Sequence, residues 1–473
     1  MSTENQNIIE PRTVKGMRDY LPETVIARRK IIETVRTVFE RYGFVPLDTP
    51  ALEYVETLVG HGDTSKNIFR SKSPEEEDIA LRFDLTVPLA RVVSQYEHLP
   101  KPFRRYQVAN VWRADKPDPG RFREFIQFDL DTVGSSSMSA DTEILCGMYD
   151  VFVALGIKNF LIRFSSRKLL DALLLFAEIP NELSKNVFRI LDKLDKISFN
   201  EVALELTVGR TDISGDKIKG LGLKNEQVNK IKQFLDLPKA TRLDSLANVE
   251  QLFASAIPSA NDGISELKEI CNYLNALNIP EEKIQIDFSL ARGLDYYTGP
   301  VFEAILLDAP EFGSVFGGGR YDGLVQRFLG KNIPAVGAST GIDRLLAALE
   351  KLQLIESTPS TAQVIVTVME RNRMSDYMQL TRELRENGIN TELYLGEEKG
   401  LGKQLQYANK QQIPLAVIIG SNEFEKDEVT IKDLRAGKNV DASNREEYMK
   451  ATKQAQITFP KTELINTIYK MLS

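Results

Sequence analysis

The stretch DFSLARGLDYYTGPVFEAILLDAPEFGSVFGGGRYDGL, residues 287–324, decides how the rest of the chain is organised. It sets Arg292 close to Tyr296 and Tyr297, continues into the apolar run VFEAILL, and closes on three successive glycines before Arg320. The apolar run indicates a buried strand, and glycine lets a backbone approach a ligand without side-chain obstruction. Guanidinium groups carry a fixed charge on a planar fork of donors. We therefore infer a pocket for an anion and a small polar ligand; a glycine-rich turn with two surface arginines is the alternative.

The composition is that of a globular protein that we expect to be cytoplasmic. The chain has 473 residues, of which 42% are hydrophobic and 27% are charged. No apolar run reaches the roughly 18 residues of a membrane helix, and the start MSTENQNIIEPR lacks the features of a secretory signal. Cys146 and Cys271 lie in helical apolar patterns, so we expect reduced core residues and no protein-held metal site. The net charge of −7 argues against nucleic acid binding over the whole surface but allows a local basic path.

The N-terminal region predicts a long helix followed by a strand. Apolar residues recur at helical spacing through residues 23–42, and Gly43 ends the pattern. Phe44 to Leu47 then indicates a strand, which Pro50 breaks or places at an edge. An ordinary helix–strand unit and a dimer-forming edge both fit this order.

A second strand is predicted in IALRFDLTVPLARVV, residues 79–93, which alternates through Phe83 and has Asp84 and Thr86 at its end. The preceding residues 60–78 are rich in glycine, serine and charge, and indicate a loop. Asp84 suits a ligand's ammonium group, and it equally suits the N-cap of a helix. The sequence leaves both roles open.

Residues 102–134 predict a β-hairpin whose strands, 106–112 and 122–133, flank the loop DKPDPG. Three arginines lie near its mouth: Arg113 after the first strand, and Arg121 and Arg123 at the start of the return strand. They either clamp a polyphosphate or are solvated charges beside a turn.

The return strand also carries three polar residues at alternate positions, Gln127, Asp129 and Asp131. Because side chains two residues apart point to the same side of a strand, these three share one face. That face is either the floor of a wet pocket or a solvent-facing surface.

The composition shifts over residues 165–280, which are rich in Leu, Lys, Asp and Asn at helical spacing. We interpret them as a helical module inserted into the main domain. Its lysines alternate with acids, so a solvated surface and a face toward a polyanion both fit.

After the organising stretch, residues 336–352 set Gly341 at the start of a helix and Arg344 one turn in, which favours phosphate over a plain capped arginine. A linker follows over residues 353–363. The remaining residues alternate strand and helix, and this order indicates a small three-layer α/β domain.

Taken together, these stretches resemble class II aminoacyl-tRNA synthetases and, among them, the histidyl-tRNA synthetase family. The helix, strand and Pro50 resemble the first class II motif, FRRYQVANVWRADKP with GRFREF the second, and GASTGIDRLLAAL the third. ARGLDYYTG and GGGRYDGL resemble the two boxes peculiar to the histidine enzymes, and KGMRDYLP and DLTVPLAR match further stretches. The resemblance covers nearly the whole chain, and the combination of motifs is far more specific than any one of them.

The resemblance implies an α+β fold with an antiparallel sheet flanked by helices. It implies a catalytic domain over residues 1–350, the helical insertion at 165–280, a linker at 351–360 and an anticodon-binding-like α/β domain at 361–473. It further implies a homodimer that activates L-histidine with ATP and Mg²⁺ and then transfers it to the terminal ribose of tRNA(His). A non-catalytic, histidine-binding regulatory paralogue is the alternative.

The resemblance also assigns roles to residues. Fixed cations near the α-phosphorus stabilise charge that builds in the transition state, and the catalytic pair would be Arg292 and Arg113. The ATP-binding residues would be Arg113, Arg121, Arg123 and Arg344. The histidine-binding residues would be Asp84, Thr86, Arg113, Gln127, Asp131, Arg292, Tyr296 and Tyr297.

One departure from the family pattern is visible. The second class II motif usually has Arg-x-Glu with the acid near adenine, whereas this chain has Arg113-Ala114-Asp115. The shorter aspartate puts the adenine contact in question but leaves the phosphate contacts unaffected.

Overall fold

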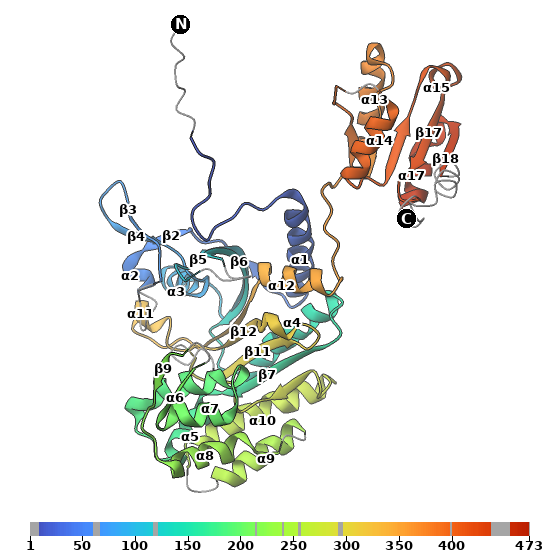
Figure 1. Cartoon of the computed structure of the whole chain (residues 1–473). Helices are drawn as coiled ribbons and strands as arrows, with labels where there is room; N and C mark the ends of the chain where they lie inside the picture. The colour runs from blue at the N-terminus through green and yellow to red at the C-terminus, as the bar shows by residue number, and fades with distance from the viewer. Residues whose placement is uncertain are drawn as a thin grey trace. The chain divides into compact units, whose positions relative to one another are not determined.

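In this computed structural model, the described residues are 9–59, 67–116, 122–212, 215–238, 241–253, 257–291, 297–397, 400–436 and 455–472. The chain divides into two compact units (Figure 1). The larger comprises residues 1–19 and 30–355, and the smaller comprises residues 20–29 and 356–473. No helix among the described residues is long and apolar enough to cross a membrane.

An eight-stranded, mostly antiparallel sheet forms the centre of the larger unit, with the order β1-β5-β6-β13-β12-β11-β7-β10. The two outermost pairs, β1 with β5 and β10 with β7, are parallel. The strands are β1 (Val45–Pro46), β5 (Phe103–Trp112), β6 (Glu124–Val133), β7 (Phe160–Ser166), β10 (Ile284–Ile286), β11 (Pro300–Leu306), β12 (Ser314–Arg320) and β13 (Ala335–Gly341). This sheet confirms the predicted fold class, and the β5–β6 pair confirms the predicted hairpin.

One face of the sheet is apolar and covered by helices. The helices α4 (Met138–Ala154) and α12 (Ile342–Lys351) and the part of α1 (Pro22–Arg41) from residue 30 onward lie along the sheet in Figure 1. Phe39 of α1 meets Phe128 of β6 with ring centroids 5.2 Å apart, and both side chains are fully buried. Because side chains alternate along a strand, Gln127, Asp129 and Asp131 point to the opposite face, as the sequence predicted.

A smaller three-stranded sheet precedes the hairpin, with strands β2 (Leu52–Tyr54), β3 (Arg70–Lys72) and β4 (Asp78–Leu81). The helices α2 (Val55–Leu58), α3 (Thr86–Gln95) and α11 (Gln326–Leu329) lie near it. Two predictions are wrong here. The expected loop contains β3, whose exposed polar residues give no apolar alternation, and the strand expected through Phe83 ends at Leu81.

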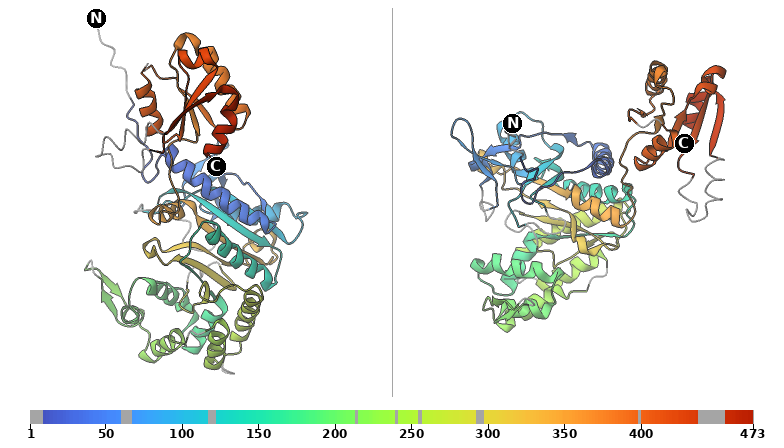
Figure 2. Two further views of the ribbon diagram at one scale, coloured as in Figure 1. Left: turned by 90° about the vertical axis from the view of Figure 1, so that its right-hand side faces the viewer. Right: turned by 45° about the horizontal axis from the view of Figure 1, so that its top comes forward.

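Residues 165–280 are largely helical, as predicted, and the turned views of Figure 2 keep these helices together as one layer. The helices are α5 (Arg167–Phe176), α6 (Ser184–Leu191), α7 (Phe199–Leu206), α8 (Asn225–Leu235), α9 (Arg242–Phe253) and α10 (Ala260–Ala276), with the short turns η2 (Asn181–Leu183) and η3 (Asp192–Asp195). A two-stranded ribbon, β8 (Gly209–Thr211) with β9 (Lys217–Lys219), interrupts them. A further short turn, η5 (Pro310–Phe312), joins β11 to β12.

The smaller unit contains a five-stranded mixed sheet with the order β15-β14-β16-β17-β18. The helices α13 and α17 pack on one face and α14 on the other, which gives the predicted three layers. Its elements are β14 (Val364–Val366), α13 (Met374–Glu386), β15 (Thr391–Leu393), α14 (Leu401–Lys410), β16 (Leu415–Ile418), α15 (Ser421–Lys426), β17 (Glu428–Asp433), β18 (Gln456–Pro460) and α17 (Leu464–Leu472). Strand β18 was not predicted, because this edge strand is mostly exposed and shows no apolar run.

Candidate functional site

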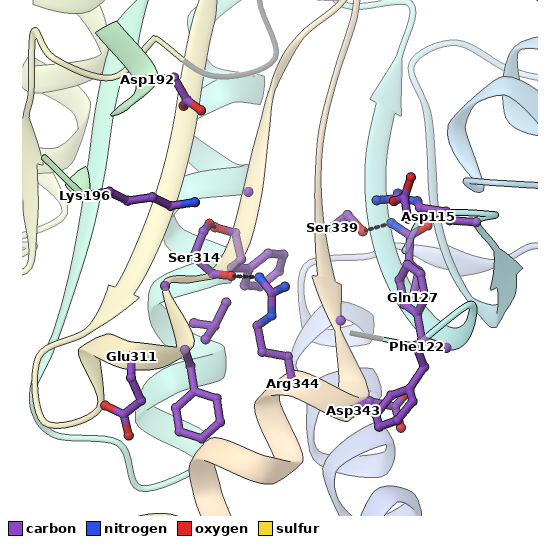
Figure 3. A pocket seen from close by; sticks show the side chains of 18 residues that line it. Asp115, Phe122, Gln127, Asp192, Lys196, Glu311, Ser314, Ser339, Asp343 and Arg344 are labelled. Carbon is purple, nitrogen blue, oxygen red and sulfur yellow. Dashed lines mark hydrogen bonds between the residues drawn. The ribbon is translucent and has the colours of Figure 1, made fainter. Parts of the chain in front are cut away.

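A cavity of about 690 Å³ opens on the polar face of the large sheet (Figure 3). Its walls come from the end of the β5–β6 hairpin, from β12 and β13, from the first turn of α12 and from the helical insertion. Three of the predicted ligand-binding residues, Arg113, Gln127 and Arg344, line it together, and Asp115 of the second motif lies beside them. Segments separated by more than two hundred residues therefore meet at one site.

Arg113 follows β5 and is held in place by the backbone around it. Its N–H donates to the carbonyl of Arg123 at 2.8 Å, and its Nε donates to the carbonyl of Phe83 at 3.0 Å. The guanidinium lies 5.2 Å from the centroid of the Phe125 ring. With the plane of the guanidinium fixed by these contacts, its terminal nitrogens are positioned to bind an anion in the cavity.

Arg344 lies in the first turn of α12, where β13 ends at Gly341. Its terminal nitrogen donates to the carbonyl of Ser314 at 2.7 Å, which orients the side chain along the cavity wall (Figure 3). The neighbouring Asp343 accepts a hydrogen bond from the Ile126 N–H at 3.0 Å and so ties α12 to β6. A helix N-terminus beside a guanidinium favours bound phosphate.

A polar row crosses three strands beside this cavity. On β6, Asp131 lies opposite Arg105 of β5, and their ion pair measures 2.8 Å. The Tyr321 hydroxyl donates to the same carboxylate. Four residues before Asp131 on the same strand, the Gln127 amide donates to the Ser339 hydroxyl of β13 at 2.8 Å. Polar groups thus replace apolar packing on this face of the sheet.

The glycines near this row serve different purposes. Gly317 lines the cavity, and a Cβ there would make only ordinary contacts. A Cβ at Gly318 would lie 2.2 Å from the Gly337 carbonyl, and one at Gly319 would lie 2.8 Å from the Tyr297 ring. A Cβ at Gly337 would lie 1.9 Å from Asp131 Oδ1. The prediction that all three glycines of the GGG run admit a ligand is therefore wrong for two of them, which accommodate protein atoms.

Burial raises the pKa of several acids in this region. It raises the pKa of Asp129 to about 7, with the nearby Asp131 adding to the rise and Arg105 opposing it. The pKa values of Asp84 and Asp131 are also raised by desolvation, while Arg113 and Arg105 lower that of Asp84. Such shifts mark sites built for polar ligands as well as structural ion pairs.

Tyr297 belongs to the same electrostatic cluster. Desolvation raises the pKa of its phenol, and the negative charges of Asp131, Asp129 and Asp84 raise it further. Asp84 also accepts a hydrogen bond from the Val87 N–H at 3.1 Å. The N-cap of α3 is Leu85, so Asp84 is not the N-cap that the sequence allowed, although it supports the first turn from one residue earlier. One of its carboxylate oxygens still remains for a ligand.

The remaining predicted residues are distributed differently. Thr86 is the first residue of α3. The Arg123 guanidinium donates to the carbonyls of Asp115 at 3.0 Å and Lys15 at 3.2 Å, and this residue is not among those lining the cavity. Arg121, Arg292 and Tyr296 lie outside the described residues.

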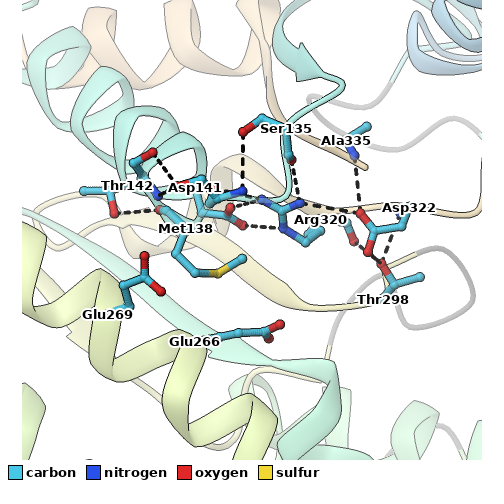
Figure 4. A network of polar contacts seen from close by, with 12 residues as sticks. Ser135, Met138, Asp141, Thr142, Glu266, Glu269, Thr298, Arg320, Asp322 and Ala335 are labelled. Carbon is cyan, nitrogen blue, oxygen red and sulfur yellow. Dashed lines mark hydrogen bonds and ion pairs between the residues drawn. The ribbon is translucent and has the colours of Figure 1, made fainter. Parts of the chain in front are cut away.

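Arg320, expected to offer its charge to an anion, is buried in a structural network (Figure 4). Its guanidinium pairs with the buried Asp141 of α4 and donates to the carbonyls of Ser135 at 2.9 Å and Ser137 at 3.3 Å. These partners occupy its donor fork, so the expectation of a ligand contact for Arg320 is wrong. The residue instead joins β12 to the start of α4.

Sequence reasoning gave no role to Arg105, Tyr321 or Ser339. Strand pairing could have identified two of them. Arg105 lies opposite Asp131 on β5 and Ser339 lies opposite Asp129 on β13, and residues directly opposite one another share a face of the sheet. Arg105 is fully buried, and an unpaired charge there would be costly, so a buried acid was required nearby. No local signal identifies Tyr321, which reaches Asp131 from the turn after β12.

The sequence is similar to known proteins over nearly its whole length. The family profile described as histidyl-tRNA synthetase matches residues 16–345, and that of an anticodon binding domain matches residues 363–468. A histidine–tRNA ligase from Cereibacter sphaeroides is 40% identical, over 98% of this chain and 97% of its own length. One from Paracoccus denitrificans is 41% identical, over 97% of each chain.

Solved structures give the same result. A histidyl-tRNA synthetase from Nostoc sp. matches with a TM-score of 0.81 and 32% identity, covering 98% of this chain and 100% of that one. A protein from Bacillus halodurans, described as an ATP phosphoribosyltransferase regulatory subunit/histidyl-tRNA synthetase, matches with a TM-score of 0.68 and 23% identity. The second likeness concerns the fold alone.

Proposed function

This chain belongs to the histidyl-tRNA synthetase family, and we propose that it activates L-histidine with ATP and transfers the histidyl group to the terminal ribose of tRNA(His). The observation that carries the proposal is the meeting of Arg113 and Arg344 in one cavity beside a row of buried carboxylates. Cations suit the triphosphate, and the carboxylate row suits the amino acid.

In the first step, the histidine carboxylate attacks the α-phosphorus of ATP and pyrophosphate leaves. Negative charge builds on the non-bridging oxygens, and Arg113 stabilises it with a guanidinium that is already oriented. Arg292 supplies a second cation at the same phosphorus. Arg344, at the start of α12, holds the outer phosphates. Arg121 and Arg123 join it at the same end, and Arg123 does so by releasing its hydrogen bonds to the Asp115 and Lys15 carbonyls.

Mg²⁺ fits this site as an ion that arrives on ATP. Carboxylates of Asp192 and Glu311 line the cavity, whereas the described residues contain no cluster of three or more His, Cys, Asp or Glu. Mg²⁺ commonly takes phosphate oxygens, waters and one or two carboxylates. When bound, it neutralises charge on the departing pyrophosphate.

Histidine itself is held by the polar row together with Asp84, Thr86 and Tyr297. Asp84, Thr86 and Gln127 take its ammonium and carboxylate end, while Asp131 and Tyr297 bracket the imidazole. That ring carries one N–H and one lone pair, so it needs an acceptor and a donor. Apolar analogues would leave these buried groups unpaired and are rejected strongly.

The same residues support proposals about partners. The anticodon-binding profile covers most of the smaller unit, which we assign to the anticodon of tRNA(His). Val45, on the edge strand β1, is 48% exposed, and this open edge suits a second copy of the chain in a homodimer. Sedimentation equilibrium would test the dimer, and a monomer at micromolar concentration would contradict it.

Histidine- and ATP-dependent pyrophosphate exchange, run across a panel of amino acids, tests the function. We expect exchange with histidine alone. Histidine binding without exchange would instead favour the regulatory paralogue, and exchange with another amino acid would contradict the assigned specificity.

Removal of residues 361–473 is expected to spare pyrophosphate exchange while lowering tRNA charging at least tenfold. The activation residues lie in the larger unit, whereas the anticodon-binding profile lies in the smaller one. Comparing the exchange and charging rates of the truncated and full chains measures the split. Equal loss of both activities would contradict it.

Histidine affinity is expected to fall about tenfold as the pH drops from 8 to 6, following protonation of one carboxylate. The pKa of Asp129 is about 7, so its carboxylate is mostly ionised at pH 8 and mostly protonated at pH 6. Only the ionised form adds negative charge beside Asp84, which takes the histidine ammonium, hence affinity is lost on the acid side. Calorimetric titration at both pH values measures it.

The control is Asp129→Asn, which is neutral at every pH. The imidazole of free histidine also titrates in this range, but it does so equally for both proteins. The difference between the pH profiles of histidine affinity for the wild-type and Asp129→Asn proteins therefore reports the titration of Asp129 alone. Identical profiles would contradict a role for the Asp129 charge in histidine binding.

A further inference from the structure

The helical insertion reaches the nucleotide cavity at η3 and the residue after it. Asp192 and Lys196 line the cavity together with Ser314 and Arg344. In Figure 3 the Lys196 side chain extends from the insertion into the cavity, with its ammonium at the inner end. The insertion is therefore part of the cavity wall.

An ion-pair network fixes this part of the insertion to the sheet. Arg163 of β7 binds both carboxylate oxygens of Asp195, at 2.9 and 3.0 Å. It also binds Asp287 at 3.3 Å and the buried Glu303 of β11. A bidentate pair fixes the orientation of its two groups as well as their distance. The backbone at Asp195 is therefore held in place, and with it the point from which the side chain of the next residue, Lys196, extends.

The neighbouring lysine behaves differently. The Lys193 ammonium pairs with the buried Glu205 at 2.5 Å, and Arg210 binds the other oxygen of that carboxylate at 2.9 Å. The Lys193 charge is thus paired within the insertion, although its side chain remains partly exposed. No hydrogen bond or ion pair joins the Lys196 ammonium to any residue in the described part of the chain, and its charge is directed to the cavity.

We propose that Lys196 binds the outer phosphates of ATP, so that the nucleotide is held between the sheet and the helical insertion. An ammonium is a compact point charge that suits phosphate oxygens, and Arg344 approaches the same end of the cavity from α12. This inference rests on the proposed activation of histidine by ATP. It gives the insertion a part in the first step of the reaction, before any tRNA is bound.

The test compares Lys196→Ala with the wild-type chain in pyrophosphate exchange. We expect the KM for ATP to rise about tenfold, the scale of one charge-assisted contact, and the KM for histidine to stay within twofold. Lys196→Arg should restore most of the ATP affinity. The matched control is Lys219→Ala, which removes an exposed lysine of the insertion that does not line the cavity.

Binding of AMP provides the second measurement, because AMP lacks the outer phosphates. Lys196→Ala should weaken ATP binding and leave AMP binding unchanged. Equal weakening of both, or a change only in the KM for tRNA, would overturn the inference. A wild-type chain without exchange would instead refute the proposed function, so the two failures are distinguishable.

Discussion

Replacing Arg113 by alanine is expected to slow histidyl-adenylate formation by about a hundred- to a thousandfold, the usual cost of removing one oriented group that stabilises transition-state charge. The Nε contact with the Phe83 carbonyl and the Phe125 ring hold the guanidinium before the substrate arrives. Little reorganisation is then needed as charge builds at phosphorus. Single-turnover kinetics with saturating ATP and histidine measure the rate of the chemical step.

Two further variants sharpen this result. Arg113→Lys keeps the charge but loses the planar fork, so it should recover only part of the rate. Arg382→Ala removes an exposed arginine of the smaller unit, which pairs with Glu386 one turn away, and should leave the rate unchanged. An Arg113→Ala enzyme with a wild-type single-turnover rate would remove this residue from the mechanism.

The sequence predicted the strands of the site better than the partners of its side chains. Alternation along β6 gave the common face of Gln127, Asp129 and Asp131, because that pattern is local. The cross-strand contacts of Arg105 and Ser339 depend on register, which is set by pairing between distant segments. Arg320 was misjudged for the same reason, since its partner Asp141 is 179 residues away.

A single residue type can also serve different roles at similar positions in the sequence. From the sequence, Asp84 suited the N-cap of a helix and a ligand equally well. In the structure Leu85 is the N-cap of α3, and one oxygen of Asp84 supports the first turn through the hydrogen bond from Val87. Glycine signals are ambiguous in the same way. The absence of a Cβ at Gly317 leaves room at a cavity, whereas at Gly318 it lets a neighbouring strand approach. The two uses differ in which segment lies opposite, and the local sequence does not specify that segment.

Replacing Gly337 by alanine is expected to raise the KM for histidine about a hundredfold and to lower the free energy of unfolding by about 3 kcal/mol, as when a buried ion pair is broken. The added Cβ would lie 1.9 Å from Asp131 Oδ1 and 2.7 Å from the Leu130 carbonyl. The carboxylate must therefore move away from Arg105 and Tyr321. The buried Arg105 then loses its counter-charge, and the imidazole loses its proposed acceptor.

Pyrophosphate exchange at varied histidine and thermal unfolding together measure both effects. Gly323→Ala is the control, since its Cβ would meet nothing within 4 Å. The KM for ATP should stay within twofold in both variants, because Gly337 lies in the polar row and does not line the nucleotide cavity. A side chain displaced by a methyl group cannot keep both Arg105 and Tyr321 as partners. A Gly337→Ala protein with wild-type stability and a wild-type KM for histidine would therefore contradict both claims, namely that these two residues hold the Asp131 carboxylate and that histidine binding requires it.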